Sequence, residues 1–234
     1  MVIHRLPLGK SVVFPRSSCP KCATPITWFE NIPLLSWLVL RGKCSHCGVR
    51  ISLRYPLVEL LTAILFTLVA ARQPHLYSIF FQFWFIGSLI ACTFIDIDHW
   101  ILPDKITLPG ILLGFLASFL PEELGWLNSL TGILFGGGLL YFVAWAYERW
   151  AKRDGLGGGD IKFLAMVGAF LGIKGAFTTL IISSMLGSLI GIFLISIRGK
   201  KSGTAIQFGP FLAIGALFAF FFGEQFWQWY FGNG

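Results

Sequence analysis

The fold class is decided by the stretch AFTTLIISSMLGSLIGIFLISI, residues 176–197, which has 22 residues and no charged side chain. Such a stretch is typical of a helix that crosses a bilayer, because backbone polar groups in hydrocarbon must pair within the helix. Six further apolar stretches follow this pattern, at approximately 56–71, 76–95, 106–120, 127–147, 161–172 and 208–231. We therefore expect an all-α polytopic membrane protein with about seven transmembrane helices. The stretch 161–172 is short and can be continuous with the next through Gly172-Ile173-Lys174.

Composition excludes the common soluble classes. Of 234 residues, 56% are hydrophobic and only 12% are charged, and the mean hydropathy is +0.75. A soluble protein of this size would need many more charged side chains to cover its surface. A soluble enzyme, a disordered tail and a secreted disulfide-rich domain are all excluded.

The net charge of +7 has a topological explanation. The first 55 residues hold eight Lys or Arg and one acid, Glu30, so the positive-inside rule places them in the cytoplasm. When the spans alternate from there, every basic residue except Arg72 and Lys174 falls on the cytoplasmic side, including Lys105, Arg149, Lys152, Arg153, Lys162, Arg198, Lys200 and Lys201. We therefore expect the charge to orient the protein in a lipid bilayer, and no nucleic-acid partner.

Four of the five cysteines form a pattern typical of a metal site. Cys19 and Cys22 make one CxxC pair, and Cys44 and Cys47 make a second after 21 intervening residues. Two such turns facing each other supply four thiolates in the tetrahedral arrangement that zinc accepts. The alternative is a pair of disulfides, which a cytoplasmic location disfavours. Four cysteine ligands leave no open position, so we expect a structural zinc site.

Acidic residues stand where apolar helices begin or end. Asp96 and Asp98 follow the stretch 76–95, and Asp160 precedes an apolar stretch, after Gly157-Gly158-Gly159. Both groups are expected at the same membrane face. A carboxylate at such a boundary is costly unless it is hydrated or paired, so these residues are candidates for function. An N-cap or an interfacial ion pair is the structural alternative, and for Asp160 alone N-capping is equally reasonable.

The glycines favour a catalytic interpretation. A run of three lets the backbone approach a substrate chain closely, which suits a loop that presents Asp160 to an extended peptide. Two carboxylates within hydrogen-bonding distance share one proton, so one can activate water while the other polarises a carbonyl. This is an aspartic-protease arrangement. A phosphate-binding loop is the competing interpretation, but the stretch lacks the Gly-Lys-Ser/Thr ending and a preceding strand.

Together these residues resemble the bacterial type IV prepilin peptidases, the GxGD-type membrane aspartic proteases. The resemblance covers almost the whole chain. It is carried by residues 2–7 (VIHRLP), 14–19 (FPRSSC), 31–37 (NIPLLSW), 41–44 (RGKC), 52–59 (SLRYPLVE), 96–104 (DIDHWILPD), 157–162 (GGGDIK) and 208–213 (FGPFLA). Family members carry one more apolar helix before the VIHRLP stretch.

The resemblance implies a bifunctional enzyme. It would cleave the basic leader of type IV prepilins and pilin-like (pseudopilin) secretion subunits after a glycine, then methylate the new N-terminus with S-adenosylmethionine. Asp96, seven residues before Pro103, matches the first catalytic aspartate of the family, and Asp160 matches the second. Gly157 and Gly159 would shape the peptide-binding loop. We interpret Asp98 as a supporting residue and Asp104 as a helix N-cap; Lys162 is expected to pair with a carboxylate such as Asp160, or to be solvated.

The expected organisation has two domains. Residues 1–55 form a cytoplasmic domain with the four-cysteine zinc site, which the resemblance links to methyl transfer, and residues 56–234 form the transmembrane peptidase. Glu59 is a candidate for the S-adenosylmethionine site. The expected location is the bacterial inner membrane, with the catalytic aspartates and the cysteines on the cytoplasmic side. The rival hypotheses are an ion-coupled transporter and an inactive membrane assembly scaffold; oligomeric state is not predicted.

Overall fold

The computed structural model describes residues 1–121, 123–151, 157–198 and 207–232. Within these ranges the chain is helical and forms no β-strand, apart from two isolated bridges, Ser18↔Pro25 and Lys43↔Arg50. The predicted all-α fold is confirmed. The contacts divide the chain into two compact units, Met1–His75 and Leu76–Gly234. Four basic residues used in the topology prediction lie outside the described ranges: Lys152, Arg153, Lys200 and Lys201.

The first unit combines irregular turns with one long helix. Its elements are α1 (Val2–Arg5), η1 (Phe29–Asn31), α2 (Leu35–Val39) and α3 (Arg54–Arg72). With 19 residues and a mostly apolar composition, α3 is long and apolar enough to cross a membrane. The contacts group α3 with the residues before it, so this unit is longer than the predicted cytoplasmic domain, which ends at residue 55. The division into a cytoplasmic domain and a transmembrane peptidase domain at residue 55 stays a prediction.

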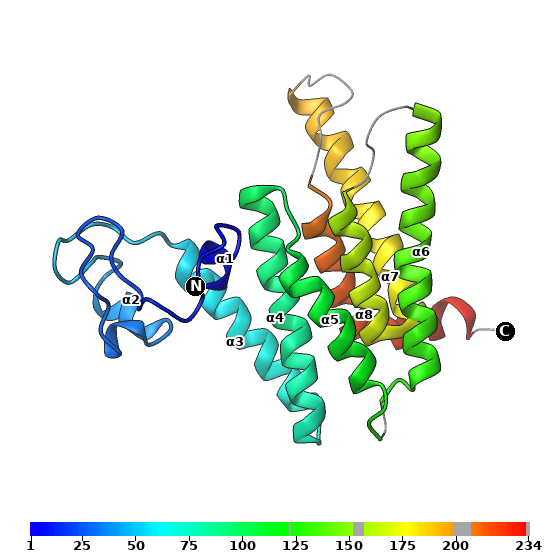
Figure 1. Cartoon of the computed structure of the whole chain (residues 1–234), viewed down its shortest axis with the longest axis horizontal. Coiled ribbons are helices and arrows are strands. Elements are labelled where there is room, and N and C mark those ends of the chain that lie inside the picture. The colour runs from blue at the N-terminus through cyan, green and yellow to red at the C-terminus, as the bar shows by residue number, and fades with distance from the viewer. Residues whose placement is uncertain (122, 152–156, 199–206, 233–234) are drawn as a thin grey trace. The chain divides into compact units, whose positions relative to one another are not determined.

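The second unit is a helical bundle, built in its described residues from α4 (Leu76–His99), α5 (Asp104–Ala117), α6 (Trp126–Ala151), α7 (Gly158–Arg198) and α8 (Gly209–Phe231) (Figure 1). The helix α7 contacts α5, α6 and α8, and α4 contacts α5 and α8. Large apolar side chains fill the space between them. Phe85, for example, is fully buried and stacks on Phe170 with ring centroids 4.6 Å apart.

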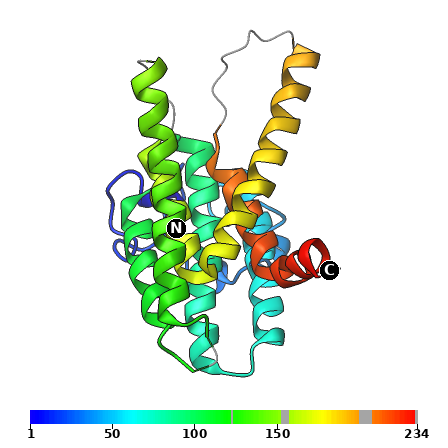
Figure 2. The same ribbon diagram turned by 90° about the vertical axis from the view of Figure 1, so that its right-hand side faces the viewer.

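The helix α7 is interrupted at Gly172. Its 41 residues would extend about 60 Å if straight, roughly twice the thickness of a bilayer core. Gly172 has φ 67° and ψ −171°, angles that are not helical and that favour glycine. Figure 2 shows the later part of α7, in gold, leaving the bundle at an angle to the earlier part. The stretches 161–172 and 176–197 therefore form two helical segments of α7 that meet at a kink at Gly172.

In the part of the chain that the structure describes, five helices are long and apolar enough to cross a membrane, namely α3, α4, α6, α7 and α8. The stretch 106–120 falls on α5, which has only 14 residues, and two predicted stretches share α7. The expected number of seven spans therefore stays a prediction. The outward side chains are suited to lipid: Leu134, Tyr141 and Phe142 of α6 are all exposed.

Two glycines bring α6 and α7 into backbone contact. A methyl group on Gly132 would overlap the carbonyl oxygen of Gly168, and a methyl group on Gly168 would overlap the carbonyl of Gly132. Such contacts let membrane helices approach closely and gain van der Waals packing. They set the distance between the two helices that contact each other most extensively.

The substitution Gly132→Ala is expected to destabilise the bundle by about 1–3 kcal/mol, because the added methyl group forces α6 and α7 apart. The control is Gly138→Ala in the same helix, where a methyl group would meet no atom within 4 Å. Thermal unfolding in detergent would compare the two variants with the parent. Equal melting temperatures for both variants would contradict the close contact.

Candidate functional site

The first candidate carboxylate, that of Asp96, lies in the last turn of α4. Its side chain is only 6% exposed. The helix ends because the N–H of Trp100 closes on the carbonyl of Asp96 at 2.8 Å, and Trp100 adopts a left-handed conformation with φ 59°. A left-handed residue directly after a helix redirects the chain. Asp96 is thus placed at an inner corner, where the chain turns from α4 towards α5.

The second candidate carboxylate, that of Asp160, lies in the first turn of α7. The helix starts at Gly158, so Asp160 is its third residue and not its N-cap. The N–H of Asp160 donates to the carbonyl of Gly157 at 3.0 Å, and the carboxylate lies back towards the N–H of Gly157, which stabilises its charge. This reciprocal pairing is typical of an acidic residue at the third position of a helix. It fixes the direction of the carboxylate.

The structure brings the two aspartates to the same end of the bundle. In Figure 1 the end of α4 and the starts of α7 and α8 lie in the upper half of the second unit, below the ends of α6 and α7, and α5 starts beneath the end of α4. Asp96 and Asp160 are close enough for their charges to interact. No direct hydrogen bond joins the two side chains among the contacts of the described residues, and a hydrogen-bonding distance between the carboxylates stays a prediction. Active-site contacts often shorten only when substrate binds.

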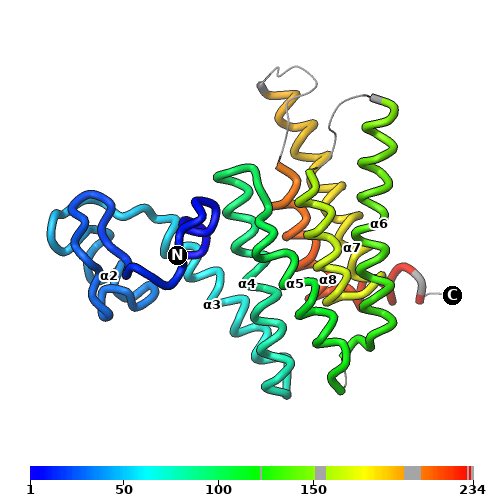
Figure 3. The backbone as a smooth tube through the Cα atoms, viewed as in Figure 1, coloured from blue at the N-terminus to red at the C-terminus, as the bar shows by residue number. Residues whose placement is uncertain are grey.

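Leu102 joins the helix starts that carry this site. It belongs to the short connection between α4 and α5, which Figure 3 traces as the chain reverses direction. A methyl group on Gly159 would lie 2.9 Å from the Cβ of Leu102, and one on Gly209 would lie 3.2 Å from its Cδ2. The first turns of α7 and α8 therefore both approach this connection closely. Sequence reasoning did not identify Leu102.

The three glycines before Asp160 have different surroundings. Gly159 packs tightly against Leu102, whereas a methyl group on Gly158 would meet no atom within 4 Å. At Gly157 it would lie 3.4 Å from Oδ2 of Asp160, an ordinary contact distance. Gly159 is thus required by contact within this chain. A further role of Gly157 and Gly159 in holding a peptide stays a prediction.

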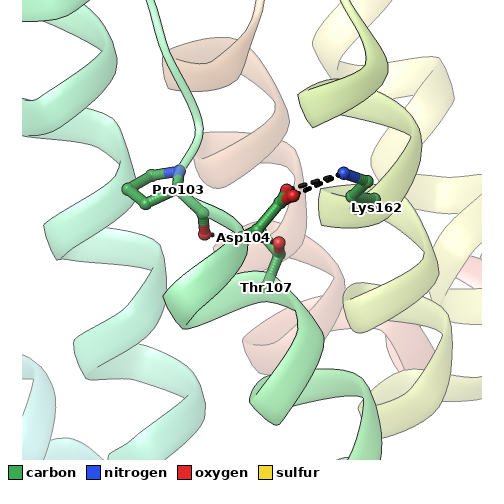
Figure 4. A network of polar contacts seen from close by, with 4 residues as sticks. All are labelled: Pro103, Asp104, Thr107 and Lys162. Atoms are coloured by element: carbon green, nitrogen blue, oxygen red, sulfur yellow. Dashed lines mark hydrogen bonds and ion pairs between the residues drawn. The ribbon is translucent and has the colours of Figure 1, made fainter. Parts of the chain in front are cut away.

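Lys162 and Asp104 form an ion pair beside the site. The Nζ of Lys162 lies 2.7 and 2.8 Å from the two carboxylate oxygens of Asp104, and this pair joins α7 to α5 (Figure 4). Lys162 therefore pairs with a carboxylate, but with that of Asp104. The predicted N-cap role of Asp104 is wrong: Pro103 is the N-cap of α5 and Asp104 its first residue, turned towards Lys162. Asp98 is exposed at the end of α4.

Two residues before and within the first turn of α8 contact Asp96. The backbone of Gly209 lies beside its carboxylate, and the side-chain amide of Gln207 donates to its backbone carbonyl at 2.7 Å. Sequence analysis noted the stretch 208–213 without a role for it. The sequence feature that could have pointed to this segment is the Gly-Pro pair at 209–210, which begins an apolar helix. A groove with a cavity volume of about 300 Å³ adjoins this turn and is lined by Ser184, Gly187, Ser188, Gln207, Phe208 and Phe211.

The four predicted metal ligands converge in the first unit. The Sγ atoms of Cys19, Cys22, Cys44 and Cys47 all lie within 4.8 Å of one another, and those of Cys19 and Cys47 are 3.8 Å apart. Zn–S bonds of about 2.3 Å in a tetrahedron require sulfur atoms about 3.8 Å apart. All four cysteines are free thiols, not disulfides. The cluster can therefore hold a metal ion through four sulfur atoms.

Two similar turns support this cluster. In each, the residue after the second cysteine donates its N–H to the carbonyl of the first: Ala23 to Cys19 at 2.9 Å, and Gly48 to Cys44 at 3.0 Å. Ala23 and Gly48 also share a left-handed conformation. Hydrogen bonds from the side chain and backbone of Thr24 lower the pKa of the Cys22 thiol to about 6. The thiolate is the form that binds metals, so this turn favours ligation.

Glu59, the candidate for the S-adenosylmethionine site, has a structural partner. Its Oε2 accepts a hydrogen bond of 2.9 Å from the N–H of Leu34, the N-cap of α2. Leu34 has φ 63°, a left-handed conformation that a non-glycine residue rarely adopts. The contact thus ties α3 to the start of α2. A role of Glu59 in cofactor binding stays a prediction.

The contact with Leu102 predicts a difference between neighbouring glycines. Gly159→Ala is expected to lower the melting temperature, because its methyl group would force the first turn of α7 away from Leu102. Gly158→Ala adds the same methyl group in open space and is expected to leave thermal unfolding unchanged or slightly raised. Differential scanning fluorimetry of both variants would measure this, and a less stable Gly158→Ala variant would argue against the described packing.

Family comparisons cover both units. A model of the bacterial peptidase A24 N-terminal domain matches residues 1–73, and a model of the type IV leader peptidase family matches residues 83–192. No solved structure matches the chain.

Curated relatives share the same printed name, prepilin leader peptidase/N-methyltransferase. The relative from Aeromonas salmonicida is 41% identical over 224 residues, which cover 94% of this chain and 76% of the relative. The Pseudomonas aeruginosa relative is 39% identical over 92% of this chain and 74% of its own length. For the Myxococcus xanthus relative the identity is 43%, over 86% of this chain and 60% of the relative.

Proposed function

Because the chain belongs to the type IV leader peptidase family, we propose that it cleaves the leader peptides of prepilins and pseudopilins and methylates the new N-terminal residue. The observation that carries the peptidase assignment is the placement of Asp96 and Asp160 at one end of the bundle, with their charges interacting. Both stand at helix boundaries, where a peptide can reach them from the membrane surface.

The pair acts as an aspartic-protease dyad. Two adjacent carboxylates hold one proton between them, since both cannot easily ionise together. The ionised aspartate draws a proton from water, which attacks the scissile carbonyl, while the protonated aspartate donates a hydrogen bond to the carbonyl oxygen. Collapse of the resulting tetrahedral intermediate breaks the C–N bond, and the amine takes up a proton from the dyad. The pair thereby returns to its starting state.

Substrates of this class combine a basic leader with an apolar helix. The apolar helix docks laterally among the spans and supplies most of the affinity, and the leader stays at the surface. The groove beside Gln207 and Phe208 supports this reading, because it opens at the same end of the bundle as the aspartates. The hydroxyl groups of Ser184 and Ser188 can form hydrogen bonds with the substrate backbone near the scissile bond, where that backbone is not helical.

The membrane orientation follows from the basic residues. We place the aspartate end of the bundle and the cysteine cluster on the cytoplasmic side of the bacterial inner membrane. In the described structure, Lys105 and Lys162 lie at the aspartate end, at the starts of α5 and α7. The whole chain is thus a multi-pass protein with both activities facing the cytoplasm.

The four-cysteine cluster fits a structural zinc ion. Cys19, Cys22, Cys44 and Cys47 supply four sulfur ligands, so no position is open for chemistry, and the ion would stabilise the two turns. S-adenosylmethionine is the methyl donor of the second reaction. We assign methyl transfer to the unit that contains the cysteines, because the proposed peptidase residues all lie in the other unit.

Asp96→Asn and Asp160→Asn are each expected to reduce kcat for prepilin cleavage by about 10²- to 10⁴-fold, since each removes one member of the acid-base pair. Asp98→Asn, at an exposed position two residues after Asp96, is the control and is expected to have a much smaller effect. Cleavage is followed by mass spectrometry of the new N-terminus. Full activity in either dyad variant would contradict the assignment of that aspartate to the dyad. Absence of cleavage by the parent would favour the scaffold hypothesis, and ion transport by the parent without cleavage would favour the transporter.

The purified chain is expected to contain about one zinc ion, measured by inductively coupled plasma mass spectrometry. Cys47→Ser should lower the zinc content and the melting temperature, because a structural zinc site contributes folding free energy directly. Cys92→Ala is the control, since Cys92 lies buried in α4, outside the cluster. Zinc bound to the Cys47→Ser variant as fully as to the parent would count against the four-cysteine site.

A further inference from the structure

The start of α8 contacts Asp96 through both its side chain and its backbone. The backbone of Gly209 lies directly beside the Asp96 carboxylate, and its N–H stabilises the charge there. The side-chain Nε2 of Gln207 donates to the carbonyl of Asp96 at 2.7 Å and to the carbonyl of Ile97 at 3.2 Å. The carbonyl of Asp96 already accepts the N–H of Trp100, so Gln207 adds a second hydrogen bond there, and at Ile97 it pairs a carbonyl of the last helical turn, where intrahelical partners run out. The last turn of α4 and the start of α8 are thereby held together.

The sequence leaves one backbone donor of this turn for the carboxylate. The N–H groups of Phe211 and Leu212 both donate to the carbonyl of Phe208, at 3.1 and 3.0 Å. Pro210 has no N–H to donate. Among residues 209–212, Gly209 therefore carries the N–H that meets Asp96. The carboxylate also faces the positive end of the α8 dipole, which favours a negative charge there.

The contact excludes any side chain at position 209. A methyl group on Gly209 would lie 2.6 Å from Oδ2 and 3.1 Å from Cγ of Asp96, and 3.2 Å from Leu102. Real Cβ atoms do not approach other atoms to 2.6 Å, so the Asp96 side chain would have to move. The backbone of Gly209 is not in the left-handed region. Glycine is therefore required at position 209 because the space beside the carboxylate is too small for a side chain, and not because of its backbone conformation.

We propose that Gly209 and Gln207 are positioning residues that hold the Asp96 carboxylate in its reactive orientation. The inference rests on the proposed function, because it assigns both residues to the same cleavage reaction. Gly209 orients the carboxylate through its N–H, and Gln207 fixes the backbone to which that carboxylate is attached. Neither residue needs to contact the substrate for this role.

This role differs from helix packing elsewhere in the bundle. At Gly132 and Gly168 the close atoms are backbone carbonyls of a neighbouring helix, so substitution there separates two helices. At Gly209 the closest atom is a side-chain oxygen, which can rotate away while the helices stay in place. Substitution at Gly209 is therefore expected to displace the carboxylate more than it disturbs the fold.

The test compares Gly209→Ala with Gly223→Ala in the same helix, where a methyl group would meet no atom within 4 Å. The substrate is a synthetic peptide with a basic leader, a glycine and an apolar helix, in lipid. We expect Gly209→Ala to reduce kcat by about 100-fold, as displacement of a catalytic group by 1 Å does, with little change in KM or melting temperature. The Gly223→Ala variant should match the parent in all three quantities.

Two results would overturn the proposal for Gly209: kcat equal to that of Gly223→Ala, or a raised KM with kcat unchanged. If Gly209→Ala instead loses activity together with a lowered melting temperature, Gln207→Glu decides, because it keeps the side-chain shape but removes both donated hydrogen bonds. The proposal requires this variant to lose kcat at an unchanged melting temperature, and full activity would reject it. Cleavage by the parent shows that the proposed peptidase function holds. Failure of the positioning role of Gly209 and Gln207 is therefore distinguishable from failure of the proposed function.

Discussion

Each of the two carboxylates is held by the backbone N–H of a glycine at the start of a helix. The N–H of Gly157 lies beside the carboxylate of Asp160 at the start of α7, and that of Gly209 lies beside the carboxylate of Asp96 at the start of α8. Burial of a carboxylate in an apolar bundle is costly unless it has a partner, and the first turn of a helix provides both unpaired donors and a favourable dipole. The bundle can therefore keep two acids close together without a cation between them.

This arrangement depends on glycine at specific positions. The first turns of α7 and α8 both press against Leu102 in the connection after α4, and a side chain at Gly159 or Gly209 would occupy that space. The left-handed Trp100 ends α4 directly after the Asp96 turn, and the Lys162–Asp104 pair joins α5 to α7 on the other side. The ion pair is partly exposed and adds little stability by itself. Its effect is to fix the starts of two helices.

The sequence predicted the features that depend on composition and spacing. Long uncharged stretches identified the membrane helices, CxxC pairs identified the cysteine cluster, and carboxylates at helix boundaries identified Asp96 and Asp160 as candidates. The features it did not predict depend on contacts between distant segments. Leu102 is an ordinary apolar residue in the sequence, and Gln207 and Gly209 acquire a role only because α8 begins beside the end of α4. The partner of Lys162 could not be predicted for the same reason, since Asp104 lies 58 residues away.

The central claim is that the aspartate pair activates a water molecule directly. A single turnover of prepilin cleavage in water enriched in oxygen-18, followed by mass spectrometry of the released leader, tests it. Direct attack by water places one oxygen-18 atom in the new carboxyl group of every leader, with none in the mature chain. Leader released without the label would mean that an enzyme carboxylate attacked the peptide bond, and absence of cleavage would contradict the account as a whole.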